Sequence, residues 1–296
     1  MIIKNYIETI YNDLKQYMYM YSEGVLCELD DLYFYDNHIP DYNKYCVQQL
    51  YLLRYSYAYI FEYMEMYTLL FGFFYSNRID YRNCEILSIG SGAGLDLYAL
   101  DSLYNKNLYY RDNFPINYVG LDIIDWQYTP TILNNDNCTF KFNLFDFYNF
   151  LINQDPYIDT NIYSNIIFFP KSIGEIQDEL LKVIPKKIYY DNIYLLISFA
   201  FDEDRLKKNN ILKYFLDNGF VYEILFDVKV DEIGKKYIND ICKDYIYPEN
   251  IKNILNELTN HFCTEKENCR LNCNVNRYPV ITNRKFNYSI IKITRL

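Results

Sequence analysis

Three glycines in alternate positions form the motif of this chain that points most clearly to chemistry. Gly90, Gly92 and Gly94 stand in one short run. The run follows an apolar stretch over 84–89, and a helical pattern begins at Leu95. Residues without a Cβ let the backbone turn sharply and approach a ligand, while the following helix presents unpaired N–H groups. The pattern predicts a ligand-binding turn between a strand and a helix, with a purely structural turn as the alternative.

Two carboxylates stand where the next strands of the expected sheet end. Asp122 ends the strand predicted over 118–122. Asp146 lies just after the strand predicted over 139–142. In an open parallel sheet the ligand lies beyond the carboxyl ends of the strands. There, Asp122 can accept hydrogen bonds from both hydroxyls of a ribose, and Asp146 lies where an adenine edge would bind. Three such features in chain order favour a ligand site over a structural turn.

The end of the next strand, predicted over 165–169, supplies candidate catalytic groups. Pro170 is followed by Lys171 and Ser172, and Glu175 comes shortly after. Lys171, Ser172 and Glu175 are therefore candidate catalytic residues. In the alternative interpretation, Ser172 caps the next helix and Glu175 completes a capping box. The two interpretations are compatible, because a capped helix can still present Lys171 to a substrate.

The spacing of apolar residues indicates an α/β protein. Residues 1–80 show helical spacing, and the nearly all-round apolar pattern over 42–74 predicts a helix buried on most sides. From Cys84 onward, short β-branched runs alternate with helical patterns, which is typical of a parallel sheet covered by helices. We expect a helical N-terminal cap over 1–80 and an α/β domain over 81–296. The later strands are expected over 189–199, 221–230 and 288–294, and helices over 176–184 and 204–218.

The glycine motif and the strand that follows it resemble a known family. Residues 86–100 with 119–122 resemble motifs I and II of the Rossmann-like (class I) S-adenosylmethionine-dependent methyltransferases. The resemblance covers about 83–296. It implies a seven-stranded, mostly parallel sheet whose last two strands form an antiparallel hairpin, with a long insertion over about 235–283 between them.

The resemblance also implies an activity and a set of site residues. The activity is the transfer of a methyl group from bound S-adenosylmethionine, with the methyl near the end of the fourth strand. The glycines would lie close to the methionine part of the cofactor, Asp122 would bind the ribose and Asp146 would face the adenine. The cofactor-binding residues implied in this way are Ser88, Gly90, Ser91, Gly92, Gly94, Asp122, Asp146, Phe169 and Pro170.

Two details bear on the choice of cofactor. Ser88 stands where the family usually has Asp or Glu, so the acid that supports the glycine loop is missing from its ordinary position. An NAD-binding unit is the alternative, but it usually has GxGxxG, and Leu95 follows Gly94 here. The spacing therefore favours S-adenosylmethionine.

A second cluster of metal-binding side chains lies near the C-terminus. His261, Cys263, Cys269 and Cys273 are closely spaced, and four such ligands suit a tetrahedral, structural zinc site. Unrelated thiols or a disulfide are the alternatives. Four further cysteines stand in core-like contexts and are interpreted as reduced, buried thiols: Cys27, Cys46, Cys84 and Cys138.

Charge is distributed unevenly along the chain. The formal charge of −10 at pH 7 combines +5 over residues 259–296 with −15 over the rest. The basic segment slightly favours a nucleic-acid substrate, RNA or DNA, over a small molecule. Ordinary surface lysines and arginines explain the segment equally well, and a non-catalytic S-adenosylmethionine-binding scaffold is a further alternative. The basic residues concerned are Arg270, Arg277, Arg284 and Lys285.

Composition excludes several classes of protein. With 51% hydrophobic and 23% charged residues, the chain is globular rather than disordered. Its first residues do not have the pattern of a secretory signal. The most apolar window, over 51–75, is broken by Arg54, Glu62 and Glu65, which argues against a membrane span. We therefore expect a cytoplasmic protein with no membrane partner.

Overall fold

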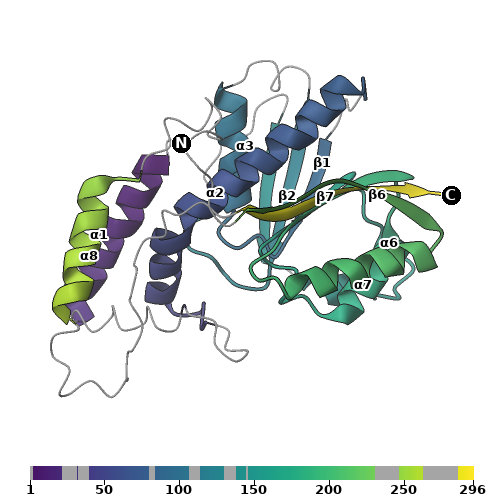
Figure 1. Cartoon of the computed structure of the whole chain (residues 1–296). Helices are drawn as coiled ribbons and strands as arrows, with labels where there is room; N and C mark the ends of the chain where they lie inside the picture. The colour runs from purple at the N-terminus through teal and green to yellow at the C-terminus, as the bar shows by residue number, and fades with distance from the viewer. Residues whose placement is uncertain are drawn as a thin grey trace.

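The chain forms an α/β fold around one mixed sheet (Figure 1). The computed structural model describes residues 3–21, 32, 40–79, 84–106, 114–129, 138–144, 146–230, 247–262 and 286–296. The strands are β1 (Cys84–Ile89), β2 (Ile116–Asp122), β3 (Cys138–Leu144), β4 (Ile166–Pro170), β5 (Asn192–Ser198), β6 (Phe220–Val230) and β7 (Phe286–Arg295). The helices are α1 (Ile3–Tyr21), α2 (Tyr45–Ser76), α3 (Leu95–Lys106), α5 (Phe147–Leu151), α6 (Asp178–Lys187), α7 (Asp204–Asp217) and α8 (Glu249–Phe262). The α/β fold expected from the sequence is confirmed.

The strand order in the sheet is β3-β2-β1-β4-β5-β7-β6. Strands β1 to β5 pair in parallel, whereas β7 runs antiparallel to both β5 and β6. The last two strands therefore pair as the resemblance implies. The order reverses between β1 and β4, and in open α/β sheets such a reversal leaves a crevice beyond the carboxyl ends of the two strands.

Alternating side chains of the strands enter two separate cores. Ile86 and Phe168 belong to the core shared with α1, α2 and α3. Leu87 and Phe169 belong to the core shared with α5, α6 and α7. This alternation follows from the strand geometry, in which successive side chains point to opposite faces. Figure 1 shows the resulting layers, with α2 and α3 on one side of the strands and α6 and α7 on the other.

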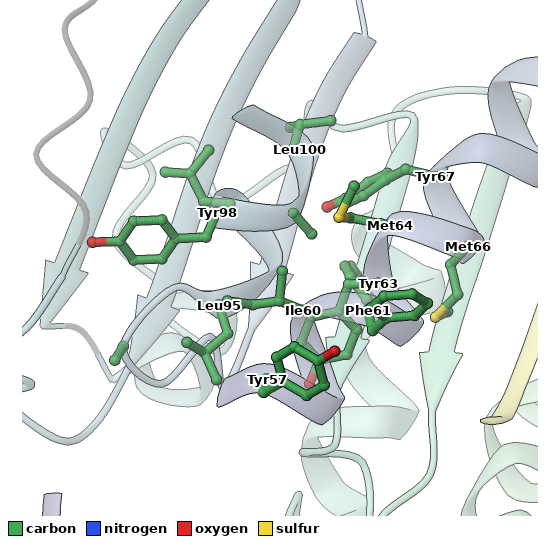
Figure 2. Close-up of a cluster of buried hydrophobic side chains, with 14 of the residues drawn as sticks. Tyr57, Ile60, Phe61, Tyr63, Met64, Met66, Tyr67, Leu95, Tyr98 and Leu100 are labelled. Carbon is green, nitrogen blue, oxygen red and sulfur yellow. The ribbon is translucent and has the colours of Figure 1, made fainter. Parts of the chain in front are cut away.

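Helix α2 is buried on most sides, as its apolar pattern predicts. Its Tyr63 and Tyr67 rings meet the Phe168 ring of β4 edge-on, with centroids 5.2 and 5.6 Å apart. Figure 2 shows these two tyrosines in one buried cluster with Leu95 and Tyr98 of α3. Because α2 packs directly on the sheet, its tyrosines are carried to the region where β4 ends.

Helices α1 and α8 extend the layer that contains α2. The Tyr6 ring of α1 lies 4.4 Å from the Tyr98 ring of α3, measured between centroids. The Tyr247 hydroxyl, just before α8, donates a hydrogen bond to the Leu53 carbonyl of α2 at 3.3 Å. Figure 1 shows α1 and α8 near the N-terminal half of α2. These contacts join the N-terminal helices and α8 to the same core as the sheet.

Two sequence expectations concern cysteines and membranes. Cys46 and Cys84 are buried thiols, as predicted. Cys27 and the side chain of Cys138 lie outside the described residues. Within the described parts of the chain, none of the helices combines the length and apolarity that a membrane crossing requires.

Candidate functional site

A cavity of about 580 Å³ lies where the strand order reverses. Its wall combines the loops after β1 and β4, the end of β2, the start of α5 and part of α2. Ligands of open α/β sheets bind at this place, and the volume falls within the usual range of small-molecule sites. The predicted site residues that line it are Gly90, Ser91, Gly92, Asp122, Asp146, Pro170, Lys171, Ser172 and Glu175.

The glycine loop is shaped by backbone conformations that favour glycine. Gly90 and Gly92 have φ values of 66° and 55°, in the left-handed region. The amide N–H groups of Gly90 and Ser91 both donate to the Leu121 carbonyl of β2, at 2.9 and 3.0 Å. A Cβ at Gly90 would lie 2.5 Å from the Cβ of Ser172. The loops after β1 and β4 are therefore so close that only glycine fits at position 90.

Asp122 ties the end of β2 to the glycine loop. Its carboxylate accepts hydrogen bonds from the amide N–H of Gly92 at 2.7 Å and of Ile124 at 2.9 Å. Burial raises the pKa of Asp122, while these hydrogen bonds oppose the rise. A carboxylate has about four acceptor positions, so two hydrogen bonds leave capacity for the hydroxyls of a ligand in the cavity.

Asp146 has a structural role as well as a place in the wall. It is the N-cap of α5, where its carboxylate accepts from the amide N–H of Asn149 at 3.0 Å. It also accepts from the Asn149 side-chain amide at 2.6 Å. These contacts hold the Asp146 carboxylate at the edge of the cavity that is supplied by the segment after β3.

Lys171 is paired with a carboxylate that the sequence did not single out. Its ammonium group donates to both oxygens of Glu62 on α2, at 2.9 and 3.0 Å, and to the Phe199 carbonyl at 2.9 Å. Glu62 is 1% exposed and also accepts from the Ser198 hydroxyl and the Asn287 amide. The three N–H groups of Lys171 are thus occupied, and the pair joins α2 to the ends of β4, β5 and β7.

Ser172 does not cap a helix, so the capping-box interpretation is wrong. Its hydroxyl donates to the Ile89 carbonyl at the end of β1, at 2.6 Å. Helix α6, predicted over 176–184, begins at Asp178 after the N-cap Gln177, so Ser172 lies six residues before it. This hydrogen bond joins the loop after β4 to the end of β1, because the loops that follow these two strands meet at the same edge of the sheet.

Among the carboxyl groups of the cavity wall, that of Glu175 has the pKa that differs most from its ordinary value. Burial raises its pKa to about 7, and the carboxylates of Asp122 and Asp204 add to the rise. By its accessible surface, however, Glu175 is an exposed residue that lines the cavity. A carboxyl group that titrates near neutral pH can accept a proton from a bound ligand under physiological conditions.

Three predicted residues lie outside the cavity wall: Ser88, Gly94 and Phe169. Phe169 is fully buried in the core that faces α6. Ser88 is fully buried next to Asp96 of α3, whose carboxylate accepts from the Tyr118 hydroxyl at 2.9 and 3.0 Å. Burial raises the pKa of Asp96 to about 6, although the hydroxyls of Ser88 and Tyr118 oppose the rise. A buried carboxylate thus lies beside the position where the family carries its acid.

The aromatic part of the wall was not predicted from the sequence as a site. Tyr42, Tyr51, Tyr59, Tyr63 and Trp126 all line the cavity. The Tyr42, Tyr51 and Trp126 rings form a triangle, with centroids 5.2 to 5.5 Å apart. Tyr51, Tyr59 and Tyr63 follow one another at intervals of eight and four residues. Such intervals place them on one face of a helix, and this is the pattern by which the sequence could have revealed them.

The predicted zinc ligands are not among the described side chains. His261 belongs to the last turn of α8, but its side chain is not described, and Cys263, Cys269 and Cys273 lie outside the described residues. The basic residues predicted to contact nucleic acid, Arg270, Arg277, Arg284 and Lys285, lie outside them as well. Over the described ranges, no group of three or more His, Cys, Asp or Glu side chains could hold a metal ion. Zinc and nucleic acid stay predictions.

Fold and site together define a Rossmann-like α/β protein with a ligand cavity at the strand reversal. No protein-family model and no curated protein matches the sequence. The chain is similar to the structure of the plantazolicin methyltransferase BpumL in complex with SAH, with 13% identity, coverage of 97% of this chain and 99% of that chain, and a TM-score of 0.39. It is also similar to a SAM-dependent methyltransferase from Archaeoglobus fulgidus, with 17% identity, coverage of 77% and 94%, and a TM-score of 0.34. The YcgJ protein from Bacillus subtilis is similar too, with 12% identity, coverage of 76% and 97%, and a TM-score of 0.36.

Proposed function

We propose that the chain is an S-adenosylmethionine-dependent methyltransferase whose methyl acceptor is a small molecule. The observation that carries this proposal is the meeting of the glycine loop, Asp122 and Asp146 in one cavity wall, from the ends of three neighbouring strands. Bound S-adenosylmethionine would supply an electrophilic methyl group on a sulfonium centre. Because methyl transfer is a displacement at that carbon, the protein contributes mainly by positioning the two reactants and excluding water.

The residues of the wall fit such a cofactor. Gly90 and Gly92 let the backbone approach the ligand, and the Asp122 carboxylate retains acceptor capacity for two ribose hydroxyls. The Ser91 hydroxyl, in the cavity wall, is buried without a hydrogen-bond partner among the described residues. Buried polar groups normally have a partner, so Ser91 supports a polar ligand group beside the glycine loop. Asp146 supports contact with the adenine.

The charge of the wall supports a small molecule rather than nucleic acid. The described part of the wall contains the carboxylates of Asp41, Asp122, Asp146 and Glu175. Its ammonium group, on Lys171, already has a buried carboxylate partner. A nucleic acid carries one negative charge per phosphate and binds through basic side chains, which this wall does not offer. The small-molecule alternative therefore agrees better with the cavity than the nucleic-acid substrate favoured by the basic C-terminal segment.

Cofactor binding is the direct test of the proposal. S-adenosylhomocysteine, the demethylated product, should raise the melting temperature of the purified chain in a saturable manner. Asp122→Asn keeps an oxygen that can accept from the loop but loses the carboxylate charge. We expect its affinity to fall about tenfold to a hundredfold, as for the loss of a charged hydrogen bond.

Asp125→Asn is the matched control for this experiment. It removes the same charge three residues later, at an exposed position outside the cavity wall, and should bind S-adenosylhomocysteine like the wild type. A wild-type chain whose melting temperature is unchanged by either S-adenosylmethionine or its product would refute the proposal. Binding without methyl transfer to any small acceptor would instead indicate a cofactor-binding scaffold protein.

A further inference from the structure

We propose that the methyl acceptor is an amine that enters the cavity as a cation, and that Glu175 takes the proton which the amine must lose. This inference rests on the proposed function, because it concerns the second ligand of the same cavity. In the proposed function, Asp122 and Asp146 bind the cofactor. Glu175, on the loop after β4, lies in the part of the wall where the resemblance places the transferred methyl.

The charges of the wall favour a cation over a neutral or anionic acceptor. Asp41 and Glu175 are the carboxylates of the described wall that the cofactor proposal does not use. Lys171 does not neutralise them, because its ammonium group is held by both oxygens of Glu62. A cavity lined by one sign of charge with apolar walls concentrates ligands of the opposite charge. Glu175 is thus an available counter-charge for an ammonium group.

Aromatic rings supply the second element of cation recognition. The rings of Tyr42, Tyr51 and Trp126 pack against one another in the wall, in tilted or edge-on pairs. The surface continues along α2 to Tyr59, whose ring already lies 5.3 Å from the Lys171 ammonium nitrogen, measured to the centroid. Rings at such distances attract ammonium groups through their negative faces. An amine cation could therefore contact rings on one side and the Glu175 carboxylate on the other.

The groups around Glu175 bring the pKa of its carboxyl group close to neutral pH. It faces the carboxylates of Asp122 at the end of β2 and Asp204 at the start of α7. The other groups that interact with it are the hydroxyls of Tyr42, just before α2, and of Tyr51 on α2, whose pKa values the Glu175 carboxylate helps to raise. None of these four groups is a cation. Burial, with the two carboxylates adding to it, raises the pKa of Glu175 to about 7. Above that pH it is a carboxylate that can bind an ammonium ion and accept its proton.

The chemical step balances with the groups present. An alkylammonium ion gives one N–H proton to Glu175, which exposes the nitrogen lone pair. The lone pair forms the N–C bond to the methyl carbon as the C–S bond breaks, and the electron pair of that bond stays on sulfur. The product leaves as a methylated ammonium ion, and Glu175 then returns its proton to the solvent. A general base near its pKa is efficient in such a transfer.

Matched pairs of amines and alcohols test the inference. Butylamine and benzylamine should bind the chain saturated with S-adenosylhomocysteine at least about tenfold more tightly than 1-butanol and benzyl alcohol at pH 8, measured by calorimetry. Glu175→Gln should abolish this preference while still binding S-adenosylhomocysteine. Glu179→Gln removes the same charge at an exposed position of α6 outside the cavity wall, and should keep the preference.

The pH dependence separates proton transfer from a merely structural role. Lowering the pH from 8 to 6 protonates Glu175, so amine binding and methyl transfer to butylamine should both weaken in the wild type. In Glu175→Gln this dependence should be absent. Equal binding of amines and alcohols by the cofactor-loaded wild type would overturn the inference but leave the proposed function standing. Failure to bind S-adenosylhomocysteine would overturn both.

The contribution of the rings can be tested at Tyr51. Tyr51→Phe keeps the ring and should keep the preference for amines. Tyr51→Leu removes the ring and should weaken amine binding by about two- to fivefold, the range for a cation–π contact at a partly exposed site, without changing the binding of the alcohols. An equal effect on amines and alcohols would contradict the assignment of the rings to cation recognition.

Discussion

Replacing Gly90 by alanine tests whether the close approach of the loops after β1 and β4 shapes the cavity. Gly90 has a φ of 66°, and an added Cβ would lie 2.5 Å from the Cβ and 3.0 Å from the hydroxyl oxygen of Ser172. Gly219, at the turn between α7 and β6, has a φ of 80° but no atom within 4 Å of an added Cβ. Alanine therefore brings backbone strain at both positions but a clash only at Gly90.

The two costs can be worked out separately. A left-handed conformation costs a residue with a Cβ about 1–2 kcal/mol, and this should be the whole loss of unfolding free energy in Gly219→Ala. Gly90→Ala must in addition displace Ser172, and inserting a carbon into a packed site costs about 1–3 kcal/mol more. We therefore expect a total of about 2–5 kcal/mol for Gly90→Ala. Gly92→Ala should resemble Gly219→Ala in stability, because its nearest neighbour, Trp126, would lie at 3.7 Å.

Urea unfolding and S-adenosylhomocysteine binding together decide the outcome. Gly219→Ala should bind S-adenosylhomocysteine like the wild type, since its position lies outside the cavity wall. Gly90→Ala should bind it at least about tenfold more weakly, because moving Ser172 changes the loop against which the ligand packs. Equal losses of stability and unchanged binding in both variants would refute the argument that the loops constrain each other.

Three further predictions concern buried charges and the cysteine cluster. The pKa of Asp96 is about 6 in the fold against 3.8 ordinarily, so the buried carboxylate lowers stability increasingly as pH rises from 4 to 7. In urea unfolding, Asp96→Asn should gain about 2 kcal/mol relative to the wild type over that range, whereas a constant difference would contradict this. Lys171→Met leaves Glu62 buried without its counter-ion and should cost about 3–5 kcal/mol of unfolding free energy. Adding Glu62→Gln to this variant should recover part of the loss. If the losses of the two single variants simply add in the double variant, Lys171 and Glu62 do not stabilise each other. Metal analysis should find about one zinc per wild-type chain and none in Cys269→Ser. A wild-type chain that contains no zinc and is nevertheless stably folded would rule the site out.

Local sequence patterns were sufficient for the α/β fold and for the side of the cavity that the glycine loop and Asp122 form. Alternating and helical spacings of apolar residues predicted the α/β order, because each spacing matches the geometry of one kind of element. The glycine run and Asp122 could be found because a turn needing residues without a Cβ and a carboxylate at a strand end are both local requirements. The helix after β4 was predicted correctly to within a few residues, but its cap was not, since Ser172 bonds to a strand that is distant in sequence.

The sequence by itself determined the strands, the glycine loop and most of the helices, with α5 and α8 as the exceptions, because these features depend on neighbours along the chain. Only the tertiary structure decided which charged side chains are available to a ligand and which are already paired within the protein. Lys171 looked like a catalytic cation, but its partner Glu62 lies 109 residues away and is buried by the packing of α2 on the sheet. The same packing brings Tyr51 of α2 into one wall with Glu175. Burial and pairing set the charge of a site, and both arise only when distant segments meet.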